Sequence, residues 1–456
     1  MEEQILYFNG IHAESGKYLK PPRSFRIGLG KKGTPRLLRD DVSLKNLAET
    51  GWGIIFAQGD PKEPAIREAM QPLLEHRRKQ ASLLCEGRYR ECTGELAYSP
   101  GEEKHEFLGR LRTGPGTVDP DHVPYYLLLV GDPKVVPFSF QYQLDVPCAV
   151  GRIHFDTLDE YENYARSVVD AETRPPQRPR KVVLFGPRHP NDPPTDISLE
   201  HLLEPLRKEL NGWRDWEVSS VVDEAATKSR LESLLGGEET PSLLFTGGHG
   251  LGYDCGHSRQ KLNQGALLCQ EWLGPGQKAP RDCFFSGDDL GNAANLSGLI
   301  SFHFACYSAG TPDYCGFSED EEVQISPEPF LARLPQRMLS HPKGGALAVV
   351  GHVDQACESS FLWKTAGSQV KTFEHTLWRL QDDFPIGAAM EPMNLRYAEI
   401  SSDVYSRRGP GEAKEWEAFL RMACEDARNY VIIGDPAVRL PAAAKPEPKK
   451  RVWRSG

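Results

Sequence analysis

A histidine and a cysteine each stand just beyond the end of a short apolar run. The run at residues 243–246 continues through two glycines to His249, and the run at residues 299–304 continues through one alanine to Cys306. A thiol becomes a useful nucleophile when a neighbouring base takes its proton, and both side chains must then meet at one rim of a rigid sheet. The pattern therefore predicts a Cys/His site in which Cys306 attacks and His249 transfers protons.

Glycines surround the histidine, at positions 247, 248 and 250. Glycine lets the backbone approach a substrate closely, and a tetrahedral oxyanion needs preorganised N–H donors. We expect the backbone N–H groups of Gly250 and Cys306 to form this oxyanion hole. Taken singly, His249 is better explained as a residue that ends a strand in a tight turn, and Cys306 as a thiol buried for packing. The catalytic interpretation is favoured only because both residues follow the ends of predicted strands.

Composition limits the other classes of function. The chain has 456 residues, 39% of them hydrophobic and 26% charged, which suits a folded protein of two or three domains. The net charge of −10 argues against nucleic acid as a partner. No window approaches the roughly 18 apolar residues of a membrane span, and the first residues lack a secretory pattern. These features predict a cytoplasmic protein with neither a nucleic-acid nor a membrane partner.

The ten cysteines are scattered and contain no C-x-x-C pair. We expect them to be reduced thiols. Cys255 and His257 are close in sequence, but no second pair at zinc-ligand spacing accompanies them. No metal or organic cofactor is therefore expected, while a calcium effect stays open.

Strand and helix signals alternate along the chain. Buried strands are predicted at 52–58 and 125–130, with helices at 63–80 and 157–171. The proline-rich stretch 174–180 marks a boundary, after which the alternation restarts. We predict a catalytically silent α/β subdomain over 1–175, a catalytic domain over 181–440 and a disordered tail over 441–456. Apolar strands alternating with helices imply a parallel or mixed sheet covered on both faces.

Several motifs resemble one family, the caspase-like clan of cysteine peptidases and its gingipain type. A strand ending in Gly131-Asp132 is followed by Asp145 and a Gly151-Arg152-Ile153 strand, and Gly434-Asp435-Pro436 resembles the segment that ends the catalytic domain. The histidine also lies roughly 50 residues before the cysteine, as in caspase-type enzymes. A short segment at 286–290 resembles the related bacterial modules known as CHAT.

The resemblance implies a caspase-like α/β sandwich: a mostly parallel central sheet flanked by helices, with an N-terminal pseudo-caspase subdomain. It also implies a cysteine endopeptidase that forms a thioester acyl-enzyme on protein substrates. We expect a regulated effector in bacterial signalling or defence, with an activating protease or regulatory protein as a possible partner. The loop at 311–330 is a candidate activation segment or a plain solvated loop. The alternative function is a silent scaffold that binds a partner.

Substrate preference stays open between basic and acidic residues, with the basic side marginally favoured. Asp354, in the loop after the predicted strand at 345–350, and Asp254 are candidates to accept a substrate arginine or lysine. Arg188, at the end of the strand at 182–185, is the candidate for an acidic residue. The chain departs from many relatives that cut after basic residues, because Phe304 stands where they place an aspartate. His303 is read as a packed histidine or as a group supporting the cysteine.

Overall fold

The computed structural model describes residues 2–6, 23–27, 42–116, 118–174, 178–212, 215–317, 323–363, 366–406 and 414–441. The predicted tail beyond residue 441 and residues 318–322 of the candidate activation loop lie outside these ranges. Near the start of the chain, β1 (Glu2–Leu6) pairs with β2 (Arg23–Ile27) as an antiparallel ribbon.

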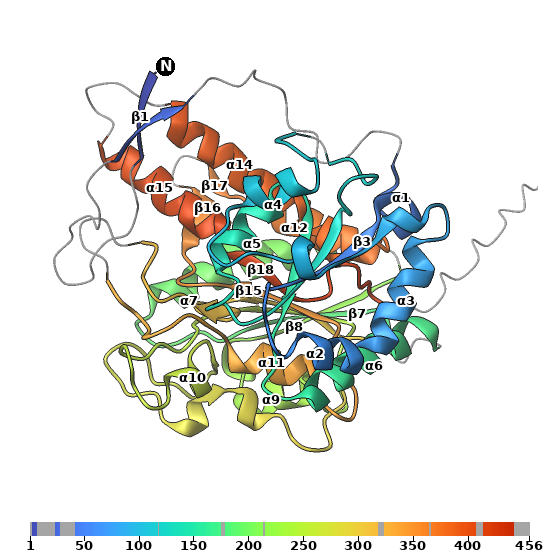
Figure 1. The fold of residues 1–456 in the computed structure, drawn as a ribbon. Coiled ribbons are helices and arrows are strands. Elements are labelled where there is room, and N and C mark those ends of the chain that lie inside the picture. The colour runs from blue at the N-terminus through green and yellow to red at the C-terminus, as the bar shows by residue number, and fades with distance from the viewer. Residues whose placement is uncertain are drawn as a thin grey trace, which may run out of the picture.

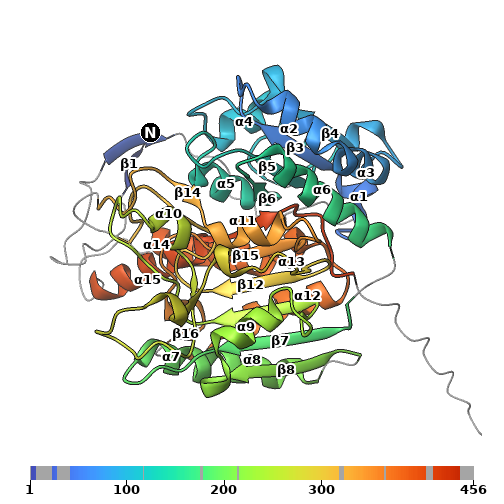
Figure 2. The ribbon, with the colours of Figure 1, turned by 90° about the horizontal axis from the view of Figure 1, so that it is seen from below.

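One ten-stranded sheet runs through the molecule (Figures 1 and 2). In spatial order its strands are β4 (Tyr89–Cys92), β3 (Trp52–Phe56), β5 (Tyr126–Val130), β6 (Ala149–Ile153), β18 (Tyr430–Gly434), β15 (Ala348–His352), β12 (Ile300–Phe304), β9 (Leu243–Gly247), β7 (Lys181–Gly186) and β8 (Glu217–Val222). All neighbours are parallel except β15 and β18. The central strands are buried throughout, which explains their continuous apolar sequences.

Three antiparallel pairs of two-residue strands lie in the loops outside the large sheet. They are β10 (Leu267–Leu268) with β11 (Phe284–Phe285), β13 (Gly310–Thr311) with β14 (Phe330–Leu331), and β16 (Leu362–Trp363) with β17 (Gly367–Ser368).

Helices cover both faces of the large sheet. Figure 1 views the sheet nearly edge on, with α4, α5, α12 and α14 on one side and α2, α9 and α11 on the other. The helices are α1 (Leu47–Thr50), α2 (Glu63–Ala69), α3 (Gln71–Ala81), α4 (Lys104–Arg110), α5 (Phe138–Asp145), α6 (Leu158–Thr173), α7 (Pro193–Ser198), α8 (Glu204–Leu210), α9 (Lys228–Leu234), α10 (Gln260–Asn263), α11 (Arg333–Leu339), α12 (Lys371–Gln381), α13 (Ile386–Ala389), α14 (Glu391–Ser406) and α15 (Lys414–Arg428). The predicted fold class, a mostly parallel sheet flanked by helices, is confirmed.

Proline explains where a predicted helix differs from the observed ones. The pattern at 63–80 predicted one helix, whereas α2 ends at Ala69 and α3 begins at Gln71. Pro72 has no N–H to donate and its ring would clash with an upstream carbonyl, so it is accommodated in the first turn of a new helix. By contrast, α6 begins where its capping box predicted, with Thr157 accepting the N–H of Glu160.

The two predicted lobes share the sheet, and the last strand of the chain lies where they meet. Figure 2 shows β3 and β4 at one end of the sheet and β7 and β8 at the other. The strand β18 pairs with β6 of the first lobe and with β15 of the second. A Cβ at Gly151 would lie 2.0 Å from the Gly434 carbonyl oxygen, so this strand contact requires glycine. The predicted boundary at 174–180 falls between α6 and β7.

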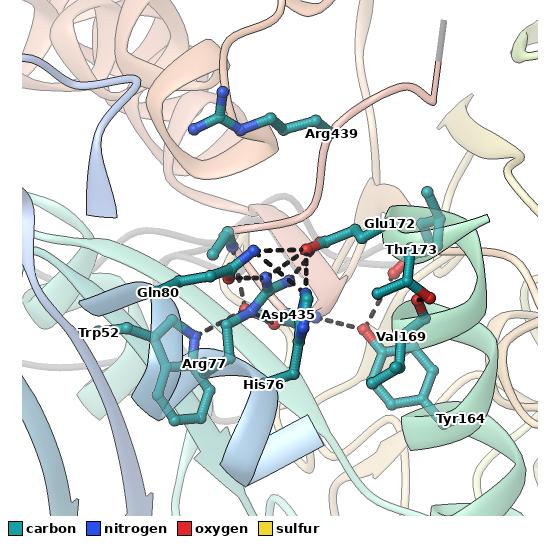
Figure 3. A network of polar contacts seen from close by, with 12 residues as sticks. Trp52, His76, Arg77, Gln80, Tyr164, Val169, Glu172, Thr173, Asp435 and Arg439 are labelled. Atoms are coloured by element: carbon teal, nitrogen blue, oxygen red, sulfur yellow. Dashed lines mark hydrogen bonds and ion pairs between the residues drawn. The ribbon is translucent and has the colours of Figure 1, made fainter. Parts of the chain in front are cut away.

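A buried charge network fastens this junction (Figure 3). Asp435, which follows β18, accepts hydrogen bonds from Trp52 Nε1 at 2.9 Å and Arg77 Nε at 2.7 Å. The Arg77 guanidinium also pairs with Glu172 of α6, at 2.6 Å from Nη2 to Oε1. Burial alone would favour the neutral carboxyl group, but Arg77 holds the pKa of Glu172 well below its ordinary value. The Gly-Asp-Pro segment therefore has a structural role in joining the lobes.

The Gly-Arg-Ile motif is structural as well. The buried Arg152 side chain donates to Gln141 Oε1 at 2.9 Å and to the carbonyl oxygens of Gly131 and Pro137 at 3.3 and 3.1 Å. These bonds hold the turn that follows β5, since its carbonyl groups would otherwise lack donors.

Candidate active site

The strands β9 and β12 deliver His249 and Cys306 to the same rim of the sheet. They are parallel neighbours, with Gly247 opposite Phe304 in the register. His249 and Cys306 each lie two residues beyond this last paired position. Because the carboxyl ends of parallel strands meet at one edge, the two turns pack together.

Gly250 fits against the backbone of Cys306. A Cβ at position 250 would lie 1.8 Å from the Cys306 carbonyl oxygen and 3.0 Å from its nitrogen. Around it, the His249 carbonyl accepts Leu268 N–H at 3.0 Å, and Leu251 N–H donates to Ala266 at 2.8 Å. The N–H groups of Gly250 and Cys306 have no carbonyl acceptor within the described residues, so both remain available to an oxyanion.

This contact makes a specific prediction for Gly250→Ala. The new methyl group must displace the Cys306 backbone, and displacements of about 1 Å in a catalytic group cost roughly 10²-fold in rate. We expect kcat/KM for a peptide substrate to fall at least that far. Gly252→Ala is the matched control, because a Cβ there meets only Tyr307 Cε2 at 3.6 Å. Equal activity of the two variants would contradict the prediction.

A third residue, Asp192, completes the cluster. His249 Nε2 lies 2.8 Å from Asp192 Oδ2, and the same oxygen accepts Thr195 Oγ1–H at 2.7 Å. The side chain of Asp192 is only 3% exposed. A carboxylate accepts at Nε2 only if that nitrogen carries the proton, so the contact with Asp192 favours this tautomer and leaves the Nδ1 lone pair able to accept a proton.

Sequence reasoning missed Asp192. It lies in the turn after β7, which is the other parallel neighbour of β9. The rule that placed His249 and Cys306 at one rim applies equally to the turn after this strand. From that turn the sequence prediction took only Arg188, and the aspartate four residues later was the available signal.

The Cys306 thiol lies under the loop that follows β15. Ala356 N–H donates to Sγ at 3.3 Å, and Sγ lies 3.7 Å from the Ala356 carbonyl oxygen. Burial raises the pKa of the Cys306 thiol to about 11, and the nearby Asp354 carboxylate also raises it. The free protein therefore holds this cysteine as a thiol at neutral pH, without a resting thiolate–imidazolium pair.

Asp354 lies close to Cys306 in the fold, but its carboxylate already accepts hydrogen bonds from two backbone N–H groups. Its carboxylate accepts Gly316 N–H at 2.7 Å and Gln355 N–H at 2.8 Å, and its carbonyl accepts Tyr307 N–H at 2.7 Å. Burial raises the pKa of the Asp354 carboxyl group. The residue lines a cavity of about 520 Å³ between the lobes, together with Lys134, Asp313, Glu328 and Arg428 among others. The lining of this cavity does not include His249 or Cys306.

The other two specificity candidates differ in their surroundings. The Arg188 guanidinium pairs with Asp196 at 2.7 Å and Glu200 at 2.6 Å, so an acidic substrate residue would have to displace carboxylates already bound. Asp254 is exposed in the loop beyond Gly250, where its carbonyl accepts His257 N–H at 3.0 Å.

His303 is a packed core residue. Its Nδ1 and Nε2 atoms lie 2.8 Å from Thr246 Oγ1 and 3.1 Å from Ser301 Oγ. Burial lowers the pKa of His303 to about 3, so the ring is neutral and takes no part in proton transfer near neutral pH.

In the part of the chain that the structure describes, no helix has the length and hydropathy needed to cross a bilayer. Within the same ranges, no group of three or more His, Cys, Asp or Glu side chains is placed to hold a metal ion. All ten cysteines are unpaired.

The mostly parallel sheet, with a cysteine and a histidine at one rim, defines a caspase-like cysteine peptidase. Residues 56–441 match the model of peptidase family C25, which spans most of the sequence, and the chain belongs to this family. It is therefore a gingipain-type cysteine endopeptidase, as the motifs predicted.

Two solved structures show the same fold. The Arg-specific cysteine proteinase gingipain R (RGPB) is 14% identical, with a TM-score of 0.52 over 90% of this chain and 80% of its own. A second structure, described only as a protease, is 13% identical, with a TM-score of 0.51 over 88% of this chain and 80% of its own. No curated protein sequence matches the chain.

Proposed function

We propose that this endopeptidase cleaves proteins with Cys306 as nucleophile, His249 as proton-transfer group and Asp192 as the residue that orients His249. One observation carries the proposal. The turns after three neighbouring strands place a hydrogen-bonded Asp192–His249 pair and the Gly250–Cys306 backbone contact at one rim.

The chemistry follows from these contacts. The thiol sulfur attacks the scissile carbonyl carbon and gives its proton to His249 Nδ1, while the carbonyl oxygen gains charge facing the N–H groups of Gly250 and Cys306. His249 then protonates the leaving amine, the C–N bond breaks, and a thioester remains on Cys306. His249 next takes a proton from water, which attacks the thioester and releases the acid and the thiol.

The raised pKa of Cys306 indicates at which stage the thiol loses its proton. Because the resting thiol is partly buried and protonated, we expect the thiolate to form only once a substrate is bound. In the free protein, the thiol is protonated and its sulfur accepts the Ala356 N–H, so it is a weak nucleophile. We propose that a bound substrate replaces the Ala356 contact and places its scissile carbonyl group next to the sulfur.

A basic preference before the cut bond is the better-supported proposal. The candidate for acidic specificity, Arg188, is already bound by two carboxylates, whereas Asp354 contacts the turn that carries Cys306. We further propose that the protein works in the cytoplasm, since ten unpaired cysteines suit a reducing compartment. Its place as a regulated effector in signalling or defence stays a prediction.

The test is a digest of proteome-derived peptides, compared between wild type and His249→Ala. Removing a positioned general acid–base group costs roughly 10²- to 10⁴-fold, so we expect new peptide ends with wild type and very few with the variant. The residue before each new cut reports the preference, and lysine or arginine is expected. Undiminished cleavage by His249→Ala would overturn the assignment. An inactive wild type is expected both of an unactivated zymogen and of the silent scaffold, so the digest is repeated after limited proteolysis, and inactivity there would favour the scaffold.

A further inference from the structure

A second imidazole, His189, lies directly behind the Asp192–His249 pair. The two histidine rings are stacked, with centroids 6.2 Å apart and planes at 23°. Trp272 packs edge to face against both rings, with its ring centroid 4.9 Å from that of His189 and 5.7 Å from that of His249. His189 is only 2% exposed and plays no part in the chemistry described above. A buried titratable ring in this position can still act on the histidine beside it.

The hydrogen bonds of His189 fix where its proton is. Nε2 lies 2.9 Å from the Cys269 carbonyl oxygen, which can only accept, so Nε2 carries hydrogen. In the neutral ring Nδ1 is then a bare lone pair, and this buried atom has no hydrogen-bond partner among the residues that the structure describes. It faces Asp192 Oδ2 at 3.6 Å, the same oxygen that His249 Nε2 contacts at 2.8 Å. Protonating Nδ1 would turn this lone-pair contact into an ion pair.

The charge of Asp192 makes this protonation relevant. Its carboxylate is almost completely buried, and no lysine or arginine pairs with it among the residues that the structure describes. A buried carboxylate without a compensating cation is costly, and a proton on one of the two imidazoles would supply a positive charge beside it. Either ring is placed to do so.

Other charged groups near this cluster are engaged elsewhere. Arg188, adjacent to His189 in the chain, directs its guanidinium to Asp196 and Glu200. Glu271, between Cys269 and Trp272, accepts the backbone N–H of Lys228. The groups that face the His189 ring are Asp192, His249, Trp272 and the Cys269 carbonyl.

We propose that His189 is a positioning residue that shares the Asp192 carboxylate with His249, so that the two imidazoles compete for one proton. The inference rests on the proposed function of His249. Protonation of either ring removes the charge that favours protonation of the other. His189 thereby limits the fraction of His249 that is protonated at Nδ1 in the free enzyme, and so sets the lower end of the pH range in which His249 can accept the thiol proton.

The experiment follows the histidine rings by NMR in protein labelled with ¹⁵N-histidine. Cys306→Ala is used as the background, which prevents self-cleavage, and His249→Gln and His189→Gln assign the two signals. Gln is chosen for His189 because its amide can still donate to the Cys269 carbonyl. With His189 present, both rings should titrate in two steps. In His189→Gln, His249 should titrate in one step, with its midpoint at higher pH than with His189 present.

The active enzyme gives a second readout. The acidic limb of kcat/KM, which reports protonation of His249 Nδ1 in the free enzyme, should move to higher pH in His189→Gln, in the same direction as the NMR midpoint. His122→Gln is the matched control, because His122 lies 3.5 Å from Asp119 in an exposed pair of the first lobe and should leave the profile unchanged.

The outcomes separate this inference from the assignment of the active site. A single-step His249 titration with His189 intact, or an unmoved midpoint in His189→Gln, would overturn the sharing of Asp192. If His189→Gln does not fold, the two-step curves with His189 intact still decide the question. The ring titrations need no catalysis, so the inference can fail while Cys306 and His249 prove catalytic, and it can survive if they do not.

Discussion

Cys306→Ala should abolish peptide cleavage while leaving the fold intact. The substitution removes the only atom that forms the acyl-enzyme, and loss of a covalent nucleophile costs roughly 10⁴-fold or more in kcat. The cost to stability should be small, because Sγ makes only weak contacts with the backbone of Ala356. Initial rates on a peptide found in the wild-type digest measure the first effect, and thermal unfolding measures the second.

Cys424→Ala is the control for Cys306→Ala. Cys424 is also partly buried and also has a weak polar contact, with Ser401 Oγ at 3.1 Å, but it belongs to α15. It should keep wild-type activity. The double variant Cys306→Ala/His249→Ala should be no slower than Cys306→Ala, since residues that act as one unit are not additive. Residual cleavage by Cys306→Ala within tenfold of wild type would refute the assigned nucleophile.

Asp435→Asn should give the largest loss of stability. The amide cannot balance the Arg77 charge, and one of its N–H groups would face either the Trp52 N–H or the Arg77 N–H. Breaking a buried ion pair typically costs about 3–5 kcal/mol, because the remaining charge is buried without its partner. Glu172 still pairs with Arg77, so we expect a value near the lower end, measured as the free energy of unfolding in urea.

Glu162→Gln provides the matched control for Asp435→Asn. Glu162 pairs with Arg166 at 3.8 Å on the exposed side of α6, where both side chains are about half exposed. Exposed pairs contribute little, so a change within about 0.5 kcal/mol is expected. If Asp435→Asn costs no more than this control, the junction between the lobes does not depend on the buried network.

The motifs that revealed the family proved to be mainly structural. Gly131 and Arg152 bond to each other, while Asp435 joins β18 to α3 and α6 through Arg77. Such residues are recognisable in a sequence because a buried arginine or a glycine at a close strand contact tolerates few replacements. They identified the fold and the class of enzyme.

The sequence alone predicted the buried strands, the capped start of α6 and the placement of His249 and Cys306 after two of those strands. These features depend on local composition and periodicity, which a short window contains. It also led to Gly250, since a glycine next to the proposed catalytic histidine allows the close backbone approach that an oxyanion hole needs.

The tertiary structure decided which side chains those residues meet. Asp192 and His189 come from a turn that only the parallel pairing of β7 and β9 brings to His249. Arg188 in the same turn is paired with Asp196 and Glu200, which lie in the two helical segments that follow. Asp354 is held by N–H groups from two loops. These contacts join segments that are far apart in the sequence, and they depend on distances of a few ångströms. Periodicity along the chain predicts neither which distant segments meet nor how closely their side chains approach.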